Sequence, residues 1–209
     1  MKTQNSHQLF CTERRTMLGS LIVGLASSTL IACSPKAEPF QGTDITGVDY
    51  AQGFRLKDQN GVERSLADFQ GKVTVVFFGF TQCPDVCPTS LTTMAEVKRL
   101  LGAQGDALQV IFITVDPERD TLPLLKAYMS NFDPNFLALR PEPSQLPSLA
   151  ADFKTYYKKV EGKTPTSYSM DHSTGKFIFD TQGRVRLYSQ YGTEAHVLKD
   201  DIQKLLKVK

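Results

Sequence analysis

The chain has 209 residues, of which 41% are hydrophobic and 22% charged, a balance typical of one globular domain with its own core. Its formal net charge of +2 arises within residues 1–32, where Lys2, Arg14 and Arg15 outnumber Glu13, so the remainder is neutral. A neutral body lacks the basic surface that binding to nucleic acid requires. Four cysteines are too few for a disulfide scaffold, so each needs its own explanation.

Residues 1–32 have the pattern of a secretory signal, in which an arginine pair precedes a short apolar stretch at 17–32. That stretch is shorter than the ~20 residues that a membrane-spanning helix needs. It ends in small residues before Cys33, which resembles a bacterial lipobox and implies cleavage before Cys33 and attachment of a lipid to it. An uncleaved anchor helix is the alternative. Both interpretations predict an exported protein at the periplasmic face of a bacterial membrane, and Arg14-Arg15 loosely resembles a twin-arginine export signal.

Residues 33–52 are rich in Gly, Pro, Asp and Gln and show no apolar period, so we predict a lipid-anchored tether there. The folded domain is therefore expected to span 53–209. Its first element is a predicted N-terminal hairpin, in which the alternating segment 54–57 turns near Asn60 and returns over 62–66.

The rest of the domain alternates between apolar runs and amphipathic segments, which predicts an α/β fold around a central mixed sheet. Residues 73–80 and 108–115 are nearly continuous apolar runs, the pattern of central parallel strands buried on both faces. A late hairpin is expected where a turn at 180–183 separates two short strands. The other predicted helices and strands are 88–102, 122–132, 144–153, 177–179, 185–188 and 193–207.

Cys83 and Cys87 lie between the first central strand and the helix that follows it, where α/β sheets commonly place their chemistry. Pro88 suits the first turn of that helix, so Cys87 is expected at its N-terminus, where amide groups favour thiolate over thiol. Two thiolates at this spacing could bind Cu(I), Zn(II) or an iron–sulfur centre. Alternatively, they could form a disulfide with each other, either redox-active or purely structural.

His172 is the predicted third ligand, because two thiolates alone do not complete the coordination of a metal ion. It lies in a polar segment before Phe177, and we expect that segment to be a loop that approaches the two cysteines. Two sulfurs and one imidazole make a soft, low-coordinate site suited to Cu(I). Asp171 could orient the imidazole. A surface histidine without function is the alternative for His172, and His196 in the last helix is expected to be solvated.

Three motifs in this order resemble the Sco/SenC family of copper proteins. They are the segment 80–91 with C-P-D-V-C-P at its centre, the segment 114–121, and Asp171-His172 followed by a strand and an Asp-x-x-Gly turn. The resemblance implies a thioredoxin-like fold with an added hairpin and a long insertion before the histidine.

The same resemblance implies one copper ion per chain, bound by Cys83, Cys87 and His172. It also implies a role in assembling the dinuclear copper centre of cytochrome c oxidase, whose copper-bearing subunit becomes the expected partner. Other periplasmic copper or thiol-redox proteins are further candidate partners, and the N-terminal lipid would attach the chain to the membrane. Some members of this family are thought to reduce the cysteines of their target instead.

Two other functions would use the same fold. A metal-independent thiol–disulfide oxidoreductase would need Cys83 and Cys87 but not His172. A thiol peroxidase is less favoured, because it needs a cation beside one thiolate and no Arg or Lys lies between Lys72 and Lys98.

Two aspartates in the second motif have open roles. Asp120 is expected to cap the helix that begins near Thr121, as Asp commonly does. The alternative for Asp116 and Asp120 is that they support the metal site or face a partner.

Overall fold

The computed structural model describes residues 39–164 and 167–207, within one compact unit from Glu38 to Lys209. The predicted signal, the arginine pair and the lipidation site Cys33 lie outside the described residues. No helix in the described part is long and apolar enough to cross a lipid bilayer.

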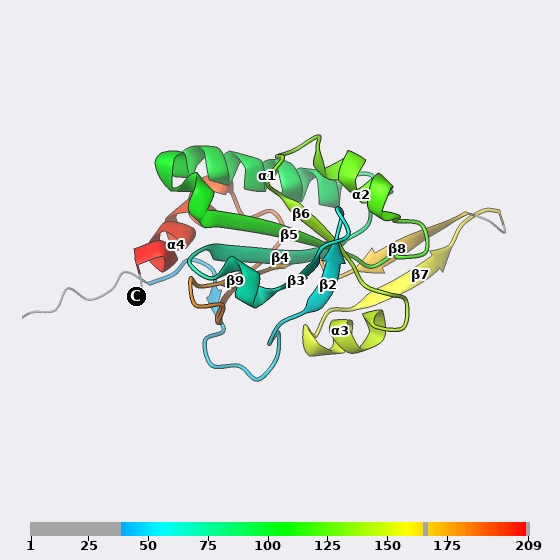
Figure 1. Cartoon of the computed structure of the whole chain (residues 1–209), viewed down its shortest axis with the longest axis horizontal. Helices are drawn as coiled ribbons and strands as arrows, with labels where there is room; N and C mark the ends of the chain where they lie inside the picture. The colour runs from blue at the N-terminus through cyan, green and yellow to red at the C-terminus, as the bar shows by residue number, and fades with distance from the viewer. Residues whose placement is uncertain (1–38, 165–166, 208–209) are drawn as a thin grey trace, which may run out of the picture. The chain divides into compact units, whose positions relative to one another are not determined.

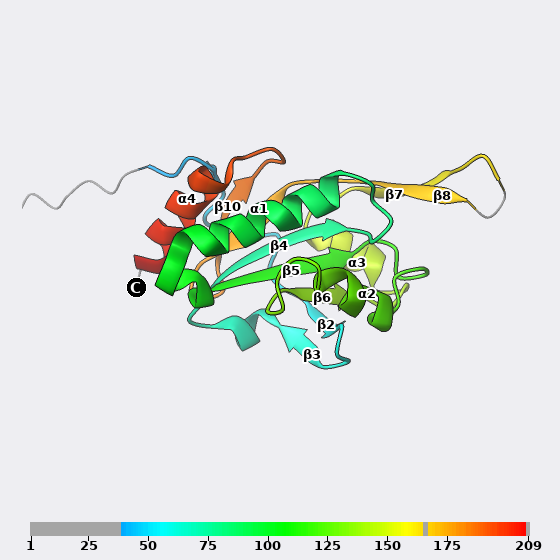
Figure 2. The same ribbon diagram turned by 90° about the horizontal axis from the view of Figure 1, so that it is seen from above.

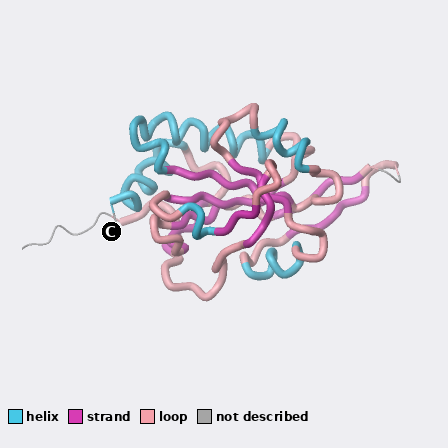
Figure 3. Tube along the Cα trace, viewed as in Figure 1, coloured by secondary structure: helices cyan, strands magenta, loops and turns pink. Residues whose placement is uncertain are grey.

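An eight-stranded mixed sheet forms the centre of the fold, with helices on both faces (Figures 1 and 3). Its strand order is β1-β10-β9-β4-β5-β6-β2-β3; β4, β5 and β6 are parallel and the other pairs antiparallel. The strands are β1 (Thr43–Asp44), β2 (Arg55–Asp58), β3 (Glu63–Ser65), β4 (Val73–Gly79), β5 (Leu108–Thr114), β6 (Leu137–Arg140), β9 (Lys176–Phe179) and β10 (Val185–Ser189).

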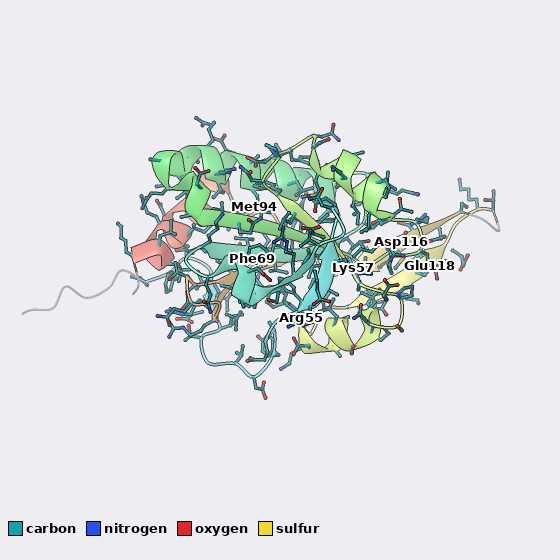
Figure 4. All side chains as sticks on the ribbon, in the orientation of Figure 1. Arg55, Lys57, Phe69, Met94, Asp116 and Glu118 are labelled. Carbon is teal, nitrogen blue, oxygen red and sulfur yellow. The ribbon has the colours of Figure 1, made fainter. Side chains whose placement is uncertain are left out.

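The helices divide the core into two layers. On one face of the sheet, α1, α2 and α4 cover a cluster that includes Met94 (Figures 2 and 4). On the other face, α3, the short helix η1 and part of the N-terminal segment cover a second cluster, which includes Phe69. The helices are η1 (Leu66–Phe69), α1 (Val86–Leu101), η2 (Gly102–Ala107), α2 (Leu122–Met129), α3 (Leu146–Asp152) and α4 (Ala195–Lys207).

The central strands confirm the apolar pattern that predicted them. Every residue of β4 and β5 is buried, and side chains alternate between the two layers. Phe77 packs toward α1, whereas Phe78 packs toward α3 and meets Phe153 edge to face at 5.3 Å. Each such side chain contributes about 1.5–3 kcal/mol by leaving water, which makes this pair of strands the rigid base of the site.

The C-terminal part of the predicted tether is not a tether in the structure. Residues 39–52 belong to the domain: β1 pairs with β10, and the N–H groups of Gln41 and Gly42 donate to the buried Asp201 carboxylate at 2.7–3.0 Å. A strand of two residues has no periodicity to detect, so the domain boundary at residue 53 was placed too late.

A second, two-stranded sheet projects from the end of the molecule and was not predicted (Figure 2). It consists of β7 (Tyr157–Glu161) and β8 (Tyr168–His172), which pair antiparallel, with Tyr157 opposite His172. The polar segment that we expected to be a loop is therefore β8. Nearly all of β7 is exposed, so β7 lacks the apolar alternation by which strands are recognised, whereas β8 alternates between exposed and more buried residues but is only five residues long.

Candidate metal centre

The two cysteines lie where β4 passes into α1. β4 ends at Gly79, residues 80–85 form the connecting segment, here called the cysteine loop, and Cys87 lies in the first turn of α1. A Cβ atom on Gly79 would lie only 2.7 Å from Cys87 Sγ and 2.4 Å from the Phe112 ring. Gly79 therefore allows the Cys87 thiol to pack directly on the end of the strand.

Asp120 anchors the cysteine loop to the neighbouring strand. Its buried carboxylate accepts hydrogen bonds from the Thr81 N–H at 3.1 Å, the Thr81 hydroxyl at 2.6 Å and the Thr114 hydroxyl at 2.5 Å. The predicted capping role for Asp120 was wrong, because Thr121 caps α2 by accepting from the Leu124 N–H. Burial raises the pKa of Asp120, and the three donors hold its carboxylate in place.

The two thiols differ in their electrostatics. Hydrogen bonding from Cys87, together with the backbone N–H groups of Cys87 and Asp85, lowers the pKa of half-exposed Cys83 to about 5. The pKa of buried Cys87 is raised, because it donates to Cys83 and because burial disfavours its thiolate. Cys83 and Cys87 are both free, so at neutral pH the pair consists of one half-exposed thiolate and one buried thiol.

His172 reaches the cysteines from the last position of β8. Its Nε2 lies 3.7 Å from Cys87 Sγ, and its Nδ1 lies 2.8 Å from the Ser173 carbonyl oxygen. A carbonyl only accepts, so Nδ1 carries the proton and the Nε2 lone pair faces the sulfurs. The ring also meets Phe80 edge to face at 5.9 Å.

Asp171 does not make the contact that was expected of it. The Nδ1 partner is the Ser173 carbonyl, and Asp171 is exposed, opposite Lys158 in the β7–β8 pairing. Successive residues of a strand face opposite sides, which turns Asp171 away from the ring of His172. His196 lies elsewhere, at the exposed start of α4, with Nδ1 3.1 Å from Glu194.

Arg119 joins the β7–β8 hairpin to the cysteine loop. Its guanidinium stacks on the Tyr168 ring at 3.5 Å and donates to the Gln82 side chain at 3.0 Å and to the Tyr168 carbonyl at 2.8 Å. Asp116 accepts hydrogen bonds from both Arg119 and the Tyr168 hydroxyl. Figure 4 places Asp116 and Glu118 beside the base of the hairpin. We call Gln82, Asp116, Arg119 and Tyr168 the Arg119 clip.

The clip was largely missed by the sequence analysis, which considered only its aspartate. Arg119 lies inside the second motif, so that motif was the available signal, but its partners come from two other segments. Asp116 contacts both Tyr168 and Arg119, so its alternative role in supporting the metal site stays a prediction.

The Cys83, Cys87 and His172 ligand atoms lie within 4.8 Å of one another. No other group of three such side chains occurs in residues 39–164 and 167–207. Two sulfurs and one neutral imidazole nitrogen suit a soft ion, and the donor set fits Cu(I) better than the hard cations that prefer oxygen. The predicted residues are thus brought together in one place.

Comparisons with known proteins agree with this geometry. Residues 43–207 match the family model described as SCO1/SenC. The chain belongs to the SCO1/SenC family. Among the relatives of this SCO1/SenC protein is the SCO2-like protein of Rickettsia felis, which is 37% identical over 170 residues that cover 79% of this chain and 83% of the relative.

Two solved structures of the family resemble this SCO1/SenC chain closely. The copper-bound ScoI of Bradyrhizobium japonicum is 38% identical, with a TM-score of 0.67, and the match covers 73% of this chain and 97% of ScoI. Copper-bound yeast Sco1 is 28% identical, with a TM-score of 0.68, and the match covers 82% and 91% of the two chains. These likenesses confirm the thioredoxin-like fold predicted from the motifs.

Proposed function

We propose that this chain binds one copper ion through Cys83, Cys87 and His172 and acts as a copper chaperone in the assembly of cytochrome c oxidase. The observation that carries the proposal is the convergence of three soft ligand atoms within 4.8 Å, from segments 85 residues apart. Two relatives with the same fold have been solved with copper bound, which supports copper as the ion.

The recipient that we propose is the dinuclear copper centre in the copper-bearing subunit of cytochrome c oxidase. Three protein ligands leave copper open to attack, whereas a closed site with four ligands would retain it. Cys83 is half exposed, so an incoming thiolate of the recipient can reach the ion from that side and displace the ligands one at a time. We place this exchange at the periplasmic face of the membrane, with the chain tethered by a lipid on Cys33.

A competition titration tests the copper site. The reduced full chain is titrated with Cu(I) against a chromophoric chelator, and His172→Ala is compared with His196→Ala, which removes an exposed imidazole. We expect His172→Ala to weaken copper binding by more than the ~10–100-fold that loss of an outer contact costs, and His196→Ala to have no effect. Unchanged affinity in His172→Ala would show that the imidazole is not a ligand.

A second function, thiol–disulfide exchange without metal, is favoured by the unequal thiols. The Cys83 thiolate would attack a disulfide of the partner and release one partner thiolate, forming a mixed disulfide. Cys87 would then lose its proton to the first leaving thiolate and attack the Cys83 sulfur, which releases the second partner sulfur as a thiolate. The partner gains two electrons, and Cys83 and Cys87 end as a disulfide.

The role of His172 separates the two functions. Reduction of a disulfide-bonded peptide taken from the recipient subunit is followed for the wild type and for His172→Ala, both without metal. We expect His172→Ala to lose copper binding. Equal reduction rates in the two proteins would support exchange as a separate activity, and loss of reduction in the variant would argue against metal-independent exchange.

A further inference from the structure

A pocket of about 660 Å³ lies between the first turns of α1 and the loop that leads into α4. Its walls come from residues 88–96 of α1 and residues 191–195 at the start of α4, and Lys176 of β9 lines it as well. α1 and α4 pack side by side over the sheet (Figure 2). None of the three proposed metal ligands lines this pocket, although Pro88 directly follows Cys87.

Lys176 is a buried amine without a protein partner. It pairs with Phe77 across β4 and β9, so its side chain lies on the same face of the sheet as Phe77, toward α1. Only 1% of the residue is exposed, and within residues 39–164 and 167–207 its amine has no hydrogen bond or ion pair. Burial alone lowers its pKa, to about 8, and the amine therefore still carries its charge at neutral pH.

An unpaired buried charge is costly unless something neutralises it. Carboxylates are the usual partners of buried lysines, yet no acidic group in the described part of the chain contacts Lys176. The compensating negative charge is therefore expected to come from outside the protein, through the pocket that Lys176 lines.

Other groups around Lys176 also suit an anion. The N–H groups of residues 195–197, at the start of α4, donate no hydrogen bond within the described residues, and Ala195 lines the pocket. A helix N-terminus of this kind carries a partial positive charge that attracts anions. Ser90, which is 3% exposed, lines the same pocket as Lys176 and can donate its hydroxyl proton.

The acidic residues at the pocket limit the charge that it can accept. Glu96 is held by two hydrogen bonds from Arg99, at 2.6 and 2.7 Å, and Glu194 lies 3.1 Å from His196. Both still repel a ligand with several negative charges, so a ligand with one charge is favoured. Tyr191, which is 38% exposed, adds an aromatic wall for an organic group.

We propose that the pocket between α1 and α4 binds a carboxylate group, paired with the Lys176 ammonium and hydrogen-bonded to the first N–H groups of α4. The carboxylate belongs either to an acidic side chain of a docked protein or to a free organic acid. Because no metal ligand takes part, this site can exist whether or not the chain carries copper.

The test is a titration of the full chain, without metal, followed by nuclear magnetic resonance at constant ionic strength. The signals of the Lys176 ammonium and of the 195–197 amides are recorded with four probes: acetate, acetyl-Ala-Glu-Ala-amide, acetyl-Ala-Gln-Ala-amide and inorganic phosphate. We expect saturable shifts with acetate and the glutamate peptide and none with the glutamine peptide. We also expect the bound carboxylate to raise the pKa of Lys176, since it stabilises the charged amine.

Variants test whether the chemical-shift changes arise from binding in the pocket. Lys176→Met keeps the length of the side chain and removes its charge, and we expect at least tenfold weaker carboxylate binding. Lys163→Met, which removes an exposed lysine, is the matched control and should bind as the wild type does. If Lys176→Met does not fold, Ser90→Ala and the wild-type titration still decide the question, since the Ser90 variant should bind several-fold more weakly.

The outcomes separate the sources of the carboxylate. Tighter binding of the glutamate peptide than of acetate supports a protein ligand, and the reverse order supports a free acid. The proposal is overturned if neither carboxylate gives saturable shifts, if phosphate binds more tightly than both, or if Lys163→Met weakens binding as much as Lys176→Met.

Discussion

The cysteine loop and the β7–β8 hairpin contribute to one metal site, but the protein holds them in different ways. The cysteine loop lies between a fully buried strand and the buried face of α1, and the Asp120 carboxylate holds it from the segment that follows β5. The β7–β8 hairpin is mostly exposed and is joined to the loop mainly through the Arg119 clip.

This contrast suggests a division of roles. The sulfurs are fixed by the core, whereas the imidazole lies on a mostly exposed hairpin and is held by the Ser173 carbonyl, by an edge-to-face contact with Phe80 and by the Arg119 clip. If the proposed function holds, we expect release of copper to begin at His172, because the core holds Cys83 and Cys87 more firmly. Substitutions in the cysteine loop and in the hairpin should therefore differ in how much they weaken the site.

The largest effect is expected for Cys87→Ser, which removes the sulfur fixed most firmly by the core. A serine hydroxyl is a poor ligand for a soft ion, so we expect copper affinity to fall by more than about 100-fold. Chelator competition on the full chain measures this change. A smaller loss in Cys87→Ser than in His172→Ala would reverse the assigned roles of the loop and the hairpin.

The rate at which Cys83 is alkylated should depend on pH, and this dependence measures how strongly the cysteine loop stabilises the Cys83 thiolate. Its pKa of about 5 means that Cys83 is a thiolate above pH 5 and gains a proton as the pH falls through that value. The iodoacetamide rate, followed by mass spectrometry of the Cys83 peptide, should be flat from pH 6 to 8. Below pH 5 it should fall by about tenfold per unit. A midpoint near the ordinary thiol value would show that Cys87 does not stabilise the thiolate.

Asp120→Asn should weaken the hydrogen bonds that anchor the cysteine loop to the core. The amide replaces a buried carboxylate that accepts three hydrogen bonds and leaves at least one donor without its partner, so we expect a loss of about 1–3 kcal/mol in the free energy of unfolding. Urea denaturation measures it. Asp171→Asn, on the exposed hairpin, is the control and should cost under about 0.5 kcal/mol.

Arg119→Met should loosen the hairpin and leave the core intact. It removes the hydrogen bonds to Gln82 and Tyr168, so we expect roughly tenfold weaker copper binding, the lower end of the range for contacts outside the ligand set. Because the variant also leaves the buried Asp116 carboxylate without its cation, we expect the free energy of unfolding to fall as well, which urea denaturation measures. The matched control is Arg55→Met at an exposed arginine, and equal losses in the two variants would show that the clip does not position His172.

The smallest effect is expected for Asp171→Asn on copper binding. Its side chain is exposed and the Ser173 carbonyl already holds the imidazole, so the affinity should stay within about twofold of the wild type. The same chelator competition measures it. A tenfold loss would restore Asp171 as the residue that orients His172.

The elements that could be predicted are those with a strong local signal. The buried strands β4 and β5 and the amphipathic helix α4 have patterns set by their own residues. The Cys83 and Cys87 pair also follows from local order, because a strand, a short loop and a helix place both sulfurs at one sheet edge. The exposed strand β7, the two-residue strand β1 and the role of Asp120 had no such signal.

The sequence by itself determined the ligand chemistry and the central strands, because side-chain type and apolar spacing are properties of neighbouring residues. Only the tertiary structure decided which nitrogen of His172 faces the sulfurs, how Arg119 connects the hairpin to the loop, and that Lys176 is buried. Those features depend on strand pairing and packing between segments far apart in the chain. Contacts of that kind leave no periodic trace in the residues that make them.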